Sequence, residues 1–391
     1  MSKINELILE LCPNGVEYKN IKDLCFENFW VMPSTPNYQN EGIPYITSKN
    51  IRNGIVMFDD VKYITDDDYK SISNNRPITE KDFLISMIGT IGEVGIVRKE
   101  DLPFDGQNMY LLRLNTNLIN IKYFYHYFTS EMVRKKLLGE KNNGNQGYLK
   151  TKNIESLKVP VPPLEVQNEI VRILDKFGEL EAELEAELEA RKSQYEFWHG
   201  QIINENFKLM KIKDICDTAV GGDVPKDNFS KEMTEQYNIP IYSNSIDLEG
   251  LYGYTDIAKI NKPCVTLSGR GAGVGHAFLR KNSFFPIIRL VCLIPKEEFV
   301  TAEYLFYAIQ LVKFKIPTTG IPQLTVPMVS EYEIPVPPLE KQNRIVNILS
   351  KFDKLINDIS EGLPAEIELR RQQYEYYRNK LLSFEELSVS E

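Results

Sequence analysis

The stretch Val161-Pro-Pro-Leu-Glu-Val-Gln-Asn-Glu-Ile-Val-Arg-Ile-Leu-Asp-Lys-Phe177 returns 175 residues later as Val336-Pro-Pro-Leu-Glu-Lys-Gln-Asn-Arg-Ile-Val-Asn-Ile-Leu-Ser-Lys-Phe352. A repeat of this length predicts two copies of one structural unit. In each copy a variable domain is followed by a Pro-rich hinge and a helix. The predicted boundaries are residues 1–158 and 207–335 for the variable domains, and residues 159–206 and 336–391 for the hinges with their helices.

Shorter matches extend the repeat into the variable domains. Ile43-Pro44 aligns with Ile239-Pro240, Gly54 falls on Gly250, and Tyr123 falls on Tyr304. The glycine-rich segment that starts at Gly89 aligns with the one that starts at Gly269. The latter lacks the spacing of a dinucleotide-binding loop, so we interpret both as tight turns that bring backbone close to another surface.

Each variable domain is predicted to be mixed α+β. Short runs rich in β-branched and aromatic residues, at 55–58, 82–86 and 109–114, are bounded by Gly, Asn and Asp, as strands are. One aromatic helix is expected in each domain, at about 121–138 and 302–315. The proline-rich hinges at 159–163 and 334–338 cannot be helix interior or central strand.

The helices after the hinges are long and carry narrow apolar seams. The first is expected from about Leu164 to Ile203, and the second should break at Gly362-Leu-Pro364. A narrow seam on a long helix favours a partner helix, so we predict antiparallel pairing in a coiled coil and an internal pseudo-two-fold repeat. The tetrads Leu180-Glu-Ala-Glu, Leu184-Glu-Ala-Glu and Leu188-Glu-Ala indicate a spacer that sets the helix length, or an acidic solvated face.

Charge and composition narrow the classes of function. The net charge is −9, yet residues 1–158 hold 20 basic and 20 acidic residues, whereas residues 159–206 hold 4 and 11. A neutral domain can still present one basic face to nucleic acid. No apolar run is long enough for a membrane span, and no signal peptide is evident, so a cytoplasmic protein is expected. The five cysteines favour small buried residues over disulfides or zinc.

Motifs for chemistry are missing from the sequence, and polar loops remain. The chain has no P-loop, no Asn/Asp-Pro-Pro-aromatic motif of amino-methyltransferases, and three histidines without metal-ligand spacing. Arg, Lys, Asn and Gln in loops suit base edges and phosphates. The predicted DNA contacts are Thr47, Ser48, Lys49, Asn50, Arg52, Thr90, Gln107, Asn108, Asn145, Gln146, Tyr148, Lys150, Ser243, Asn244, Ser245, Arg270, Thr319 and Gln323.

The doubled block, followed by Arg191-Lys-Ser-Gln-Tyr195 and Arg370-Arg-Gln-Gln-Tyr-Glu-Tyr-Tyr377, resembles the specificity subunit of type I restriction–modification enzymes. The resemblance implies two target-recognition domains that each read half of a bipartite double-stranded DNA site. It also implies that the helices bind modification (methyltransferase) subunits, two in number, and restriction/translocase subunits. S-adenosylmethionine, ATP and Mg²⁺ would be bound by those partners, with no cofactor in this chain. The expected partner contacts are Phe177, Tyr195, Trp198, Phe352, Tyr374 and Tyr377.

Two other functions compete with this one. A coiled-coil scaffold with protein-binding domains would use the same helices, but it would not need two frames with divergent polar loops. A self-contained nuclease or methyltransferase would need the motifs that the sequence lacks.

Overall fold

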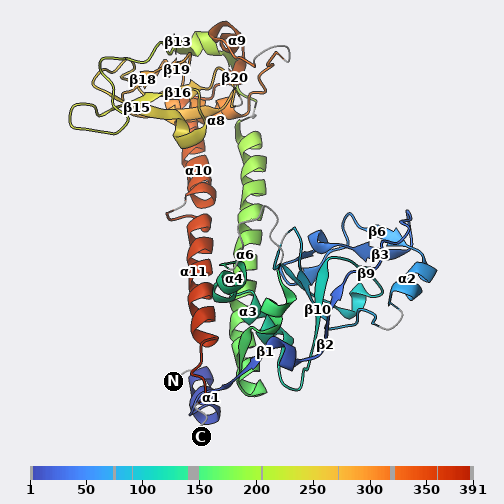
Figure 1. Ribbon diagram of the computed structural model, residues 1–391. Coiled ribbons are helices and arrows are strands. Elements are labelled where there is room, and N and C mark those ends of the chain that lie inside the picture. Colours follow the sequence, from blue (N-terminus) through green and yellow to red (C-terminus); the bar gives the residue numbers. More distant parts are fainter. Residues whose placement is uncertain are drawn as a thin grey trace. The chain divides into compact units, whose positions relative to one another are not determined.

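The protein divides into two compact units in a computed structural model (Figure 1). The first unit comprises Met1–Glu183 and Ile367–Glu391, and the second comprises Leu184–Glu366. The structure describes residues 3–73, 76–89, 91–139, 149–203, 206–271, 273–317, 322–358 and 360–387.

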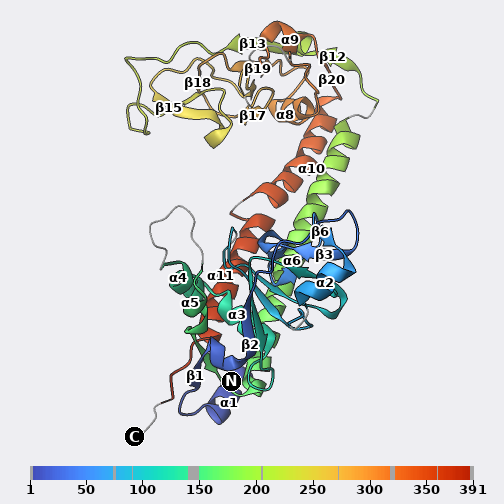
Figure 2. The same ribbon diagram turned by 45° about the vertical axis from the view of Figure 1, so that its right-hand side comes forward.

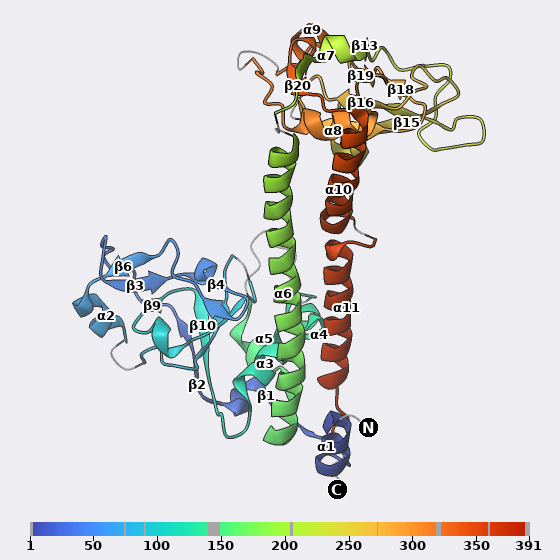
Figure 3. The same ribbon diagram turned by 180° about the vertical axis from the view of Figure 1, so that it is seen from behind.

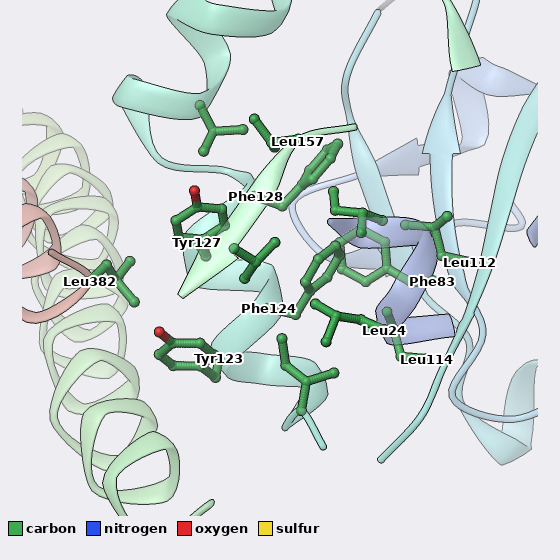
Figure 4. Close-up of a cluster of buried hydrophobic side chains, with 14 of the residues drawn as sticks. Leu24, Phe83, Leu112, Leu114, Tyr123, Phe124, Tyr127, Phe128, Leu157 and Leu382 are labelled. Atoms are coloured by element: carbon green, nitrogen blue, oxygen red, sulfur yellow. The ribbon is translucent and has the colours of Figure 1, made fainter. Parts of the chain in front are cut away.

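The first unit is built on a four-stranded antiparallel sheet with a core on each face. Its strand order is β2 (Cys25–Val31), β10 (Met109–Leu114), β7 (Phe83–Ser86) and β8 (Val94–Ile96). Successive residues of the central strand β10 alternate between the two cores, since Leu112 packs with Phe83 on one face and Leu111 with Leu84 on the other. This is the two-residue period of a strand buried on both sides. Figure 4 shows the core that contains Phe83, Leu112 and Leu114.

Smaller elements complete the first unit. The strand β3 (Ile43–Ile46) lies between β6 (Lys62–Ile64) and β9 (Asp105–Gly106), and it pairs in parallel with β9. Its other elements are α1 (Lys3–Leu11), β1 (Glu17–Asn20), η1 (Ile21–Leu24), η2 (Ser48–Asn50), β4 (Ile51–Arg52), β5 (Ile55–Val56), α2 (Asp66–Ser73), η3 (Lys99–Asp101) and α5 (Thr151–Glu155).

The predicted aromatic helix at 121–138 is two helices. α3 (Ile121–Phe128) ends where the Thr129 hydroxyl donates to the Tyr125 carbonyl at 2.8 Å, and α4 (Glu131–Gly139) begins after Ser130. The Ser130 carbonyl accepts the Arg134 N–H at 2.9 Å and so starts the new helix. Hydroxyl side chains that bond nearby backbone groups favour helix ends over helix interiors, and this signal was missed in the sequence. In Figure 2, α3 and α4 lie beside α11 (Leu363–Leu381), and the His126 ring of α3 is 3.0 Å from the Tyr374 hydroxyl of α11.

The second unit repeats this topology. Its sheet has the order β13 (Cys216–Val220), β19 (Val291–Pro295), β16 (Cys264–Leu267) and β17 (Ala277–Arg280). The strand β14 (Ile239–Tyr242) lies between β15 (Leu251–Thr255) and β18 (Phe285–Pro286), again with one parallel pair. The predicted helix at 302–315 ends earlier, as α8 (Ala302–Gln310). The remaining elements are β12 (Leu209–Lys211), α7 (Ile212–Ile215), η4 (Asp247–Gly250) and α9 (Val326–Ser330).

The Pro-rich hinges form edge strands, as their prolines require. β11 (Lys158–Val161) pairs with β1, and β20 (Glu333–Pro335) pairs with β12, each in a two-stranded sheet. Each hinge then leads into a helix that begins directly after Pro163 or Pro338. Since proline has no N–H and a fixed φ, it suits the residue where a helix starts.

The long helices have the predicted bounds and the predicted break. α6 runs from Leu164 to Ile203, while α10 (Leu339–Asn357) and α11 (Leu363–Leu381) are separated at Gly362. A side chain on Gly362 would lie 2.6 Å from the Asp358 carbonyl oxygen and 2.7 Å from that of Lys354. The chain can therefore turn this tightly only with glycine at that position.

The helices pair antiparallel within each unit. In the first unit the Phe177 ring stacks on Tyr377 at 5.4 Å, and Arg371 donates to Glu181 at 2.5 Å, so residue numbers rise along α6 as they fall along α11. In the second unit the end of α6 shares a core with the start of α10, where Ile203 packs with Ile345. Figure 3 shows the same elements from behind. No helix in the described ranges is both long and apolar enough to span a membrane.

Candidate nucleic-acid interface

In the second unit the predicted contact residues converge on Asn244, just after strand β14. The Asn244 side-chain oxygen accepts the Gly269 N–H at 2.7 Å, and its amide nitrogen donates to the Ile288 carbonyl. The Ser268 hydroxyl donates to the Asn244 carbonyl at 3.0 Å. Three loops that are distant in sequence are thereby tied together at one end of the sheet.

A fourth loop joins this cluster through backbone pairing. Arg270 and Gln323 form an antiparallel bridge, and the Leu324 N–H donates to the Gly269 carbonyl at 2.8 Å. Both Arg270 and Gln323 are exposed. The structure thus brings together two residues that the sequence places 53 positions apart, with their side chains available to a ligand.

The first unit builds a related cluster after strand β3. The Gln107 N–H donates to the Ile46 carbonyl at 3.1 Å, and the Met87 N–H donates to the Asn108 carbonyl at 3.1 Å. The Ser48 hydroxyl lies 3.9 Å from where a side chain on Gly89 would begin. The loops that carry Thr47 to Asn50, Gly89 and Gln107-Asn108 therefore meet at one place.

The loop before α5 reaches the same place. A side chain on Gly92 would begin 4.0 Å from the buried Leu149, the residue that precedes Lys150. Lys150 itself is exposed at the N-cap of α5. In the second unit Leu324 and Thr325 have the matching places before α9, with Leu324 buried and Thr325 at the N-cap.

Hydrogen bonds correct the predicted alignment of the two glycine turns. The Gly92 N–H donates to the Ser86 carbonyl at 2.9 Å, and the Gly275 N–H donates to the Ser268 carbonyl at 2.8 Å. Ser86 therefore corresponds to Ser268, two residues beyond the predicted match. The left-handed Gly89 (φ 80°) accordingly corresponds to Gly271 (φ 95°), not to Gly269. The second turn is one residue longer, which a comparison of glycine spacing alone could not detect.

Three of the predicted contacts use their side chains inside the protein. Asn50 is buried, accepts the Thr47 N–H at 3.0 Å and donates to the Asp59 carbonyl at 3.1 Å. Ser243 is buried and donates to the Gly250 carbonyl at 3.2 Å. Both ends of the Asn244 amide are engaged as described above. Their structural role is to place the neighbouring residues, because an amide that is fully bonded within the protein has little capacity left for a base edge.

The other described residues of the predicted set differ in how available they are. Lys49 is exposed and bonds Asp60 at 2.6 Å, and this ion pair lowers the pKa of the Asp60 carboxyl. Such a pair between exposed side chains is weak in water, so Lys49 can exchange Asp60 for phosphate at little cost. Arg52 and Ser245 are exposed, while Thr47, Ser48, Gln107 and Asn108 are half-buried. Thr90, Asn145, Gln146, Tyr148 and Thr319 lie outside the described residues.

Two residues of the second cluster were missed in the sequence. Ile288 and Arg289 are exposed, and they lie just before the central strand β19, where Gln107 and Asn108 precede β10 in the first unit. The signal that could have found them is the aligned strand register, because Tyr110 pairs with Ile85 as Val291 pairs with Leu267. The low sequence identity of these strands hid that register.

The predicted partner contacts lie on the paired helices. In the first unit Tyr374 is half-buried, with its hydroxyl 3.0 Å from the His126 ring, and Tyr377 is 41% exposed. In the second unit Tyr195 stacks on His199, and the exposed Trp198 meets Phe197 edge-on at 5.3 Å. Phe177 and Phe352 are half-buried.

The exposed aromatic pair occurs once in each repeat with the same geometry. Phe197 and Trp198 have ring centroids 5.3 Å apart at 78°, and Tyr376 and Tyr377 have theirs 5.3 Å apart at 77°. The two pairs are separated by the 179 residues that also separate Tyr195 from Tyr374. Tyr and Trp are enriched in the contact surfaces between proteins.

Comparison with known proteins identifies the family. The model for the type I restriction modification DNA specificity domain matches residues 13–190 and again 204–369. A protein of Mycoplasma pneumoniae named as a type I specificity subunit is 39% identical over 254 residues, which is 60% of this chain and 75% of that protein. One of Haemophilus influenzae, named as a type I restriction enzyme specificity subunit, is 33% identical over 290 residues, 68% of this chain and 73% of that protein.

Solved structures share the fold. A chain from a study of complex assembly and conformational transition in the type I restriction–modification system has a TM-score of 0.65 at 15% identity, and the match covers 95% of this chain and 98% of that one. The S subunit of the type I system of M. genitalium has a TM-score of 0.56 at 14% identity, covering 94% and 96%. Since the family model matches nearly the whole chain in two copies, the protein belongs to the DNA specificity subunits of type I restriction–modification systems.

Proposed function

We propose that each unit reads one half of a bipartite DNA site, through the loop cluster at the end of its sheet. The observation that carries this proposal is that the same cluster is built twice, after β3 and after β14, but is lined by different side chains. A shared frame fixes the position of the loops on the duplex, whereas different side chains at the base edges give each half its own sequence.

Reciprocal loop variants test this division. Arg270→Ala with Gln323→Ala should change the preferred bases of one half-site and leave the other half unchanged, because the two residues form one bridge in the second unit. Arg52→Ala with Lys150→Ala should do the reverse. Methylated adenines are mapped across the genome of cells that carry each variant with its partner subunits.

A matched control is Arg344→Ala, which removes an exposed arginine from the helix α10, outside both loop clusters. It should leave both half-sites unchanged. If either loop variant altered both halves equally, or altered neither, the proposed division between the units would be wrong.

We further propose that the duplicated aromatic pairs bind two copies of the modification subunit. The same pair of rings at equivalent places offers two equivalent docking points, which suits two identical partners. Trp198→Ser should remove one methyltransferase subunit from the complex and Trp198→Ser with Tyr377→Ser should remove both, as measured by native mass spectrometry.

Leu369→Ser is the control for this experiment, because Leu369 is 60% exposed on α11 without belonging to an aromatic pair. The Leu369→Ser chain should bind the same number of modification subunits as the unmodified chain. A double variant that retained two partner subunits would contradict the proposed docking points.

We propose that the partner subunits, and not this chain, carry the catalytic sites. S-adenosylmethionine for adenine methylation would be held by the modification subunits, and ATP and Mg²⁺ by restriction/translocase subunits. This chain would contribute the choice of DNA sequence, and the complex would act on DNA in the cytoplasm.

A further inference from the structure

The turn Ile288-Arg289 carries backbone strain at the surface. Ile288 has φ 51° and Arg289 has φ 58°. A positive φ is uncommon for any residue except glycine, and for a β-branched residue such as isoleucine it is an outlier that costs free energy. Conformations of this kind persist only where the surroundings impose them, and they concentrate at functional sites.

The surroundings of this turn do impose it. The Ile288 N–H donates to the Gly222 carbonyl at 2.8 Å, and the Arg289 N–H donates to the Gly221 carbonyl at 3.0 Å. The Asn244 amide donates to the Ile288 carbonyl. A side chain on Gly221 would begin 2.6 Å from the Ile287 carbonyl oxygen, so only glycine allows this approach.

Folding alone does not account for what the turn displays. The Ile288 side chain is 51% exposed, so little apolar burial offsets the strain. Arg289 is also exposed, and its side chain has no hydrogen-bond or ion-pair partner among the described residues. Both side chains are held where a ligand could meet them.

The turn lies within the loop cluster of the second unit. A side chain on Gly269 would begin 2.9 Å from the Arg289 carbonyl oxygen and 3.1 Å from that of Leu324. Arg270 follows Gly269 and Gln323 precedes Leu324, and these two exposed residues form the antiparallel bridge. The loops that carry Ile288, Arg289, Arg270 and Gln323 thus meet in one cluster, and all four residues are exposed.

The first unit has a less strained turn at the same place. There Asn108, the counterpart of Arg289, is left-handed at φ 65°, whereas Gln107, the counterpart of Ile288, does not have a positive φ. The second unit therefore differs from the first by placing an isoleucine at a positive φ, which is an unfavourable backbone conformation for that residue. A requirement on the side chain, rather than on the fold, explains such a departure.

We propose that Ile288 and Arg289 contact base pairs of the second half-site in the major groove. Ile288 packs on the 5-methyl group of a thymine, and Arg289 donates to O6 and N7 of a guanine. The assignment rests on the proposed function, since it requires that the second unit binds duplex DNA.

The test uses the full chain in complex with its modification subunits. Ile288→Asn replaces the isoleucine by a residue type that tolerates a positive φ better. Thermal stability should stay the same or rise, because strain is relieved, while methylation of the wild-type second half-site should fall relative to one-base variants of it. Arg289→Ala removes the proposed bidentate contact and should lower the same discrimination roughly 5- to 150-fold, without a change in melting temperature.

Ile257→Asn is the matched control, because Ile257 is an exposed isoleucine of the same unit without positive φ. It should leave methylation unchanged. If Ile288→Asn lowered stability and left base preference intact, Ile288 would be structural and the inference overturned; unchanged preference in both variants overturns it as well. If instead the unmodified complex showed no bipartite preference at all, the proposed function itself would fail, which distinguishes the two cases.

Discussion

The side-chain oxygen of Gln342 accepts a hydrogen bond from the Thr301 N–H at 3.0 Å, so a residue of the repeated block locks the start of α8. The Gln342 amide also donates to the carbonyls of Phe299 and Pro337, both at 2.8 Å. Gln167 does the same in the first unit, accepting from the Asn120 N–H at 2.7 Å. Both glutamines have no exposed surface.

Gln342→Ala should therefore destabilise the second unit by about 2 to 4 kcal/mol, because three backbone groups lose their partner and the one at Pro337 is fully buried. Chemical denaturation would measure this loss. Gln372→Ala, at an exposed glutamine of α11, should cost less than about 0.5 kcal/mol. Equal effects of the two substitutions would show that the buried bonds contribute nothing.

Arg113→Met should destabilise the first unit by about 3 to 5 kcal/mol. Asp82 is buried, and Arg113 holds its carboxylate with two bonds of 2.9 and 2.8 Å, so the variant leaves a buried charge unpaired. In the second unit Cys264 and Ile294 take the equivalent places. The double variant Asp82→Cys with Arg113→Ile should be milder than Arg113→Met alone, and a harsher double variant would refute the electrostatic cause.

Asp105→Asn should stabilise the protein at pH 7. Burial raises the pKa of the Asp105 carboxyl to about 6, so the folded state holds the proton more tightly than the unfolded state. The free energy of unfolding of the unmodified chain is therefore highest, as far as Asp105 is concerned, below about pH 4. It falls as the pH rises through about 6, by a total on the order of 2 to 3 kcal/mol. Asparagine keeps an acceptor for the Gly106 N–H, which bonds Asp105 at 2.7 Å.

Unfolding free energies of the Asp105→Asn variant and of the unmodified chain, measured at pH 4 and pH 7, check this prediction. The gain should be present at pH 7 and nearly absent at pH 4. A gain of equal size at both values would point to a cause other than the titration of Asp105.

Arg280→Met should relax the sequence preference of the second half-site. The buried Arg280 lies 3.7 Å above the Tyr242 ring and bonds both the carboxylate and the carbonyl of Glu249, which is held at φ 52°. Losing these bonds frees the turn that follows Ser243 to Ser245. Methylation mapping should show more tolerated bases in the second half only; changes in both halves would mean that the whole fold is affected.

Deleting Leu184-Glu-Ala-Glu187 should shorten the unread spacer between the half-sites by about one base pair. Four residues of α-helix account for about 6 Å of rise and about 40° of rotation, and one base pair advances about 3.4 Å with about 36° of rotation. The leucine seam continues in register after the deletion. An unchanged spacer in the methylation map would mean that the tetrads serve only as an acidic helix face.

The sequence by itself determined the frame of this protein. The doubled block implied two units, the apolar seam implied the full length of α6, and Gly362 with Pro364 implied the break between α10 and α11. These features follow from local physics, since helix periodicity and the constraints of glycine and proline act over a few residues. Strands such as β10 were recognisable for the same reason.

Tertiary structure alone decided which side chains the candidate site presents. Asparagine is a residue type that bonds base edges, but the Asn244 side chain is engaged by Gly269 and Ile288, 25 and 44 residues away in sequence. Ile288 carried no sequence signal for the site, and its turn is held in place by hydrogen bonds to the Gly221 and Gly222 carbonyls. Whether a polar group is free depends on partners far away in sequence, and no local pattern records them.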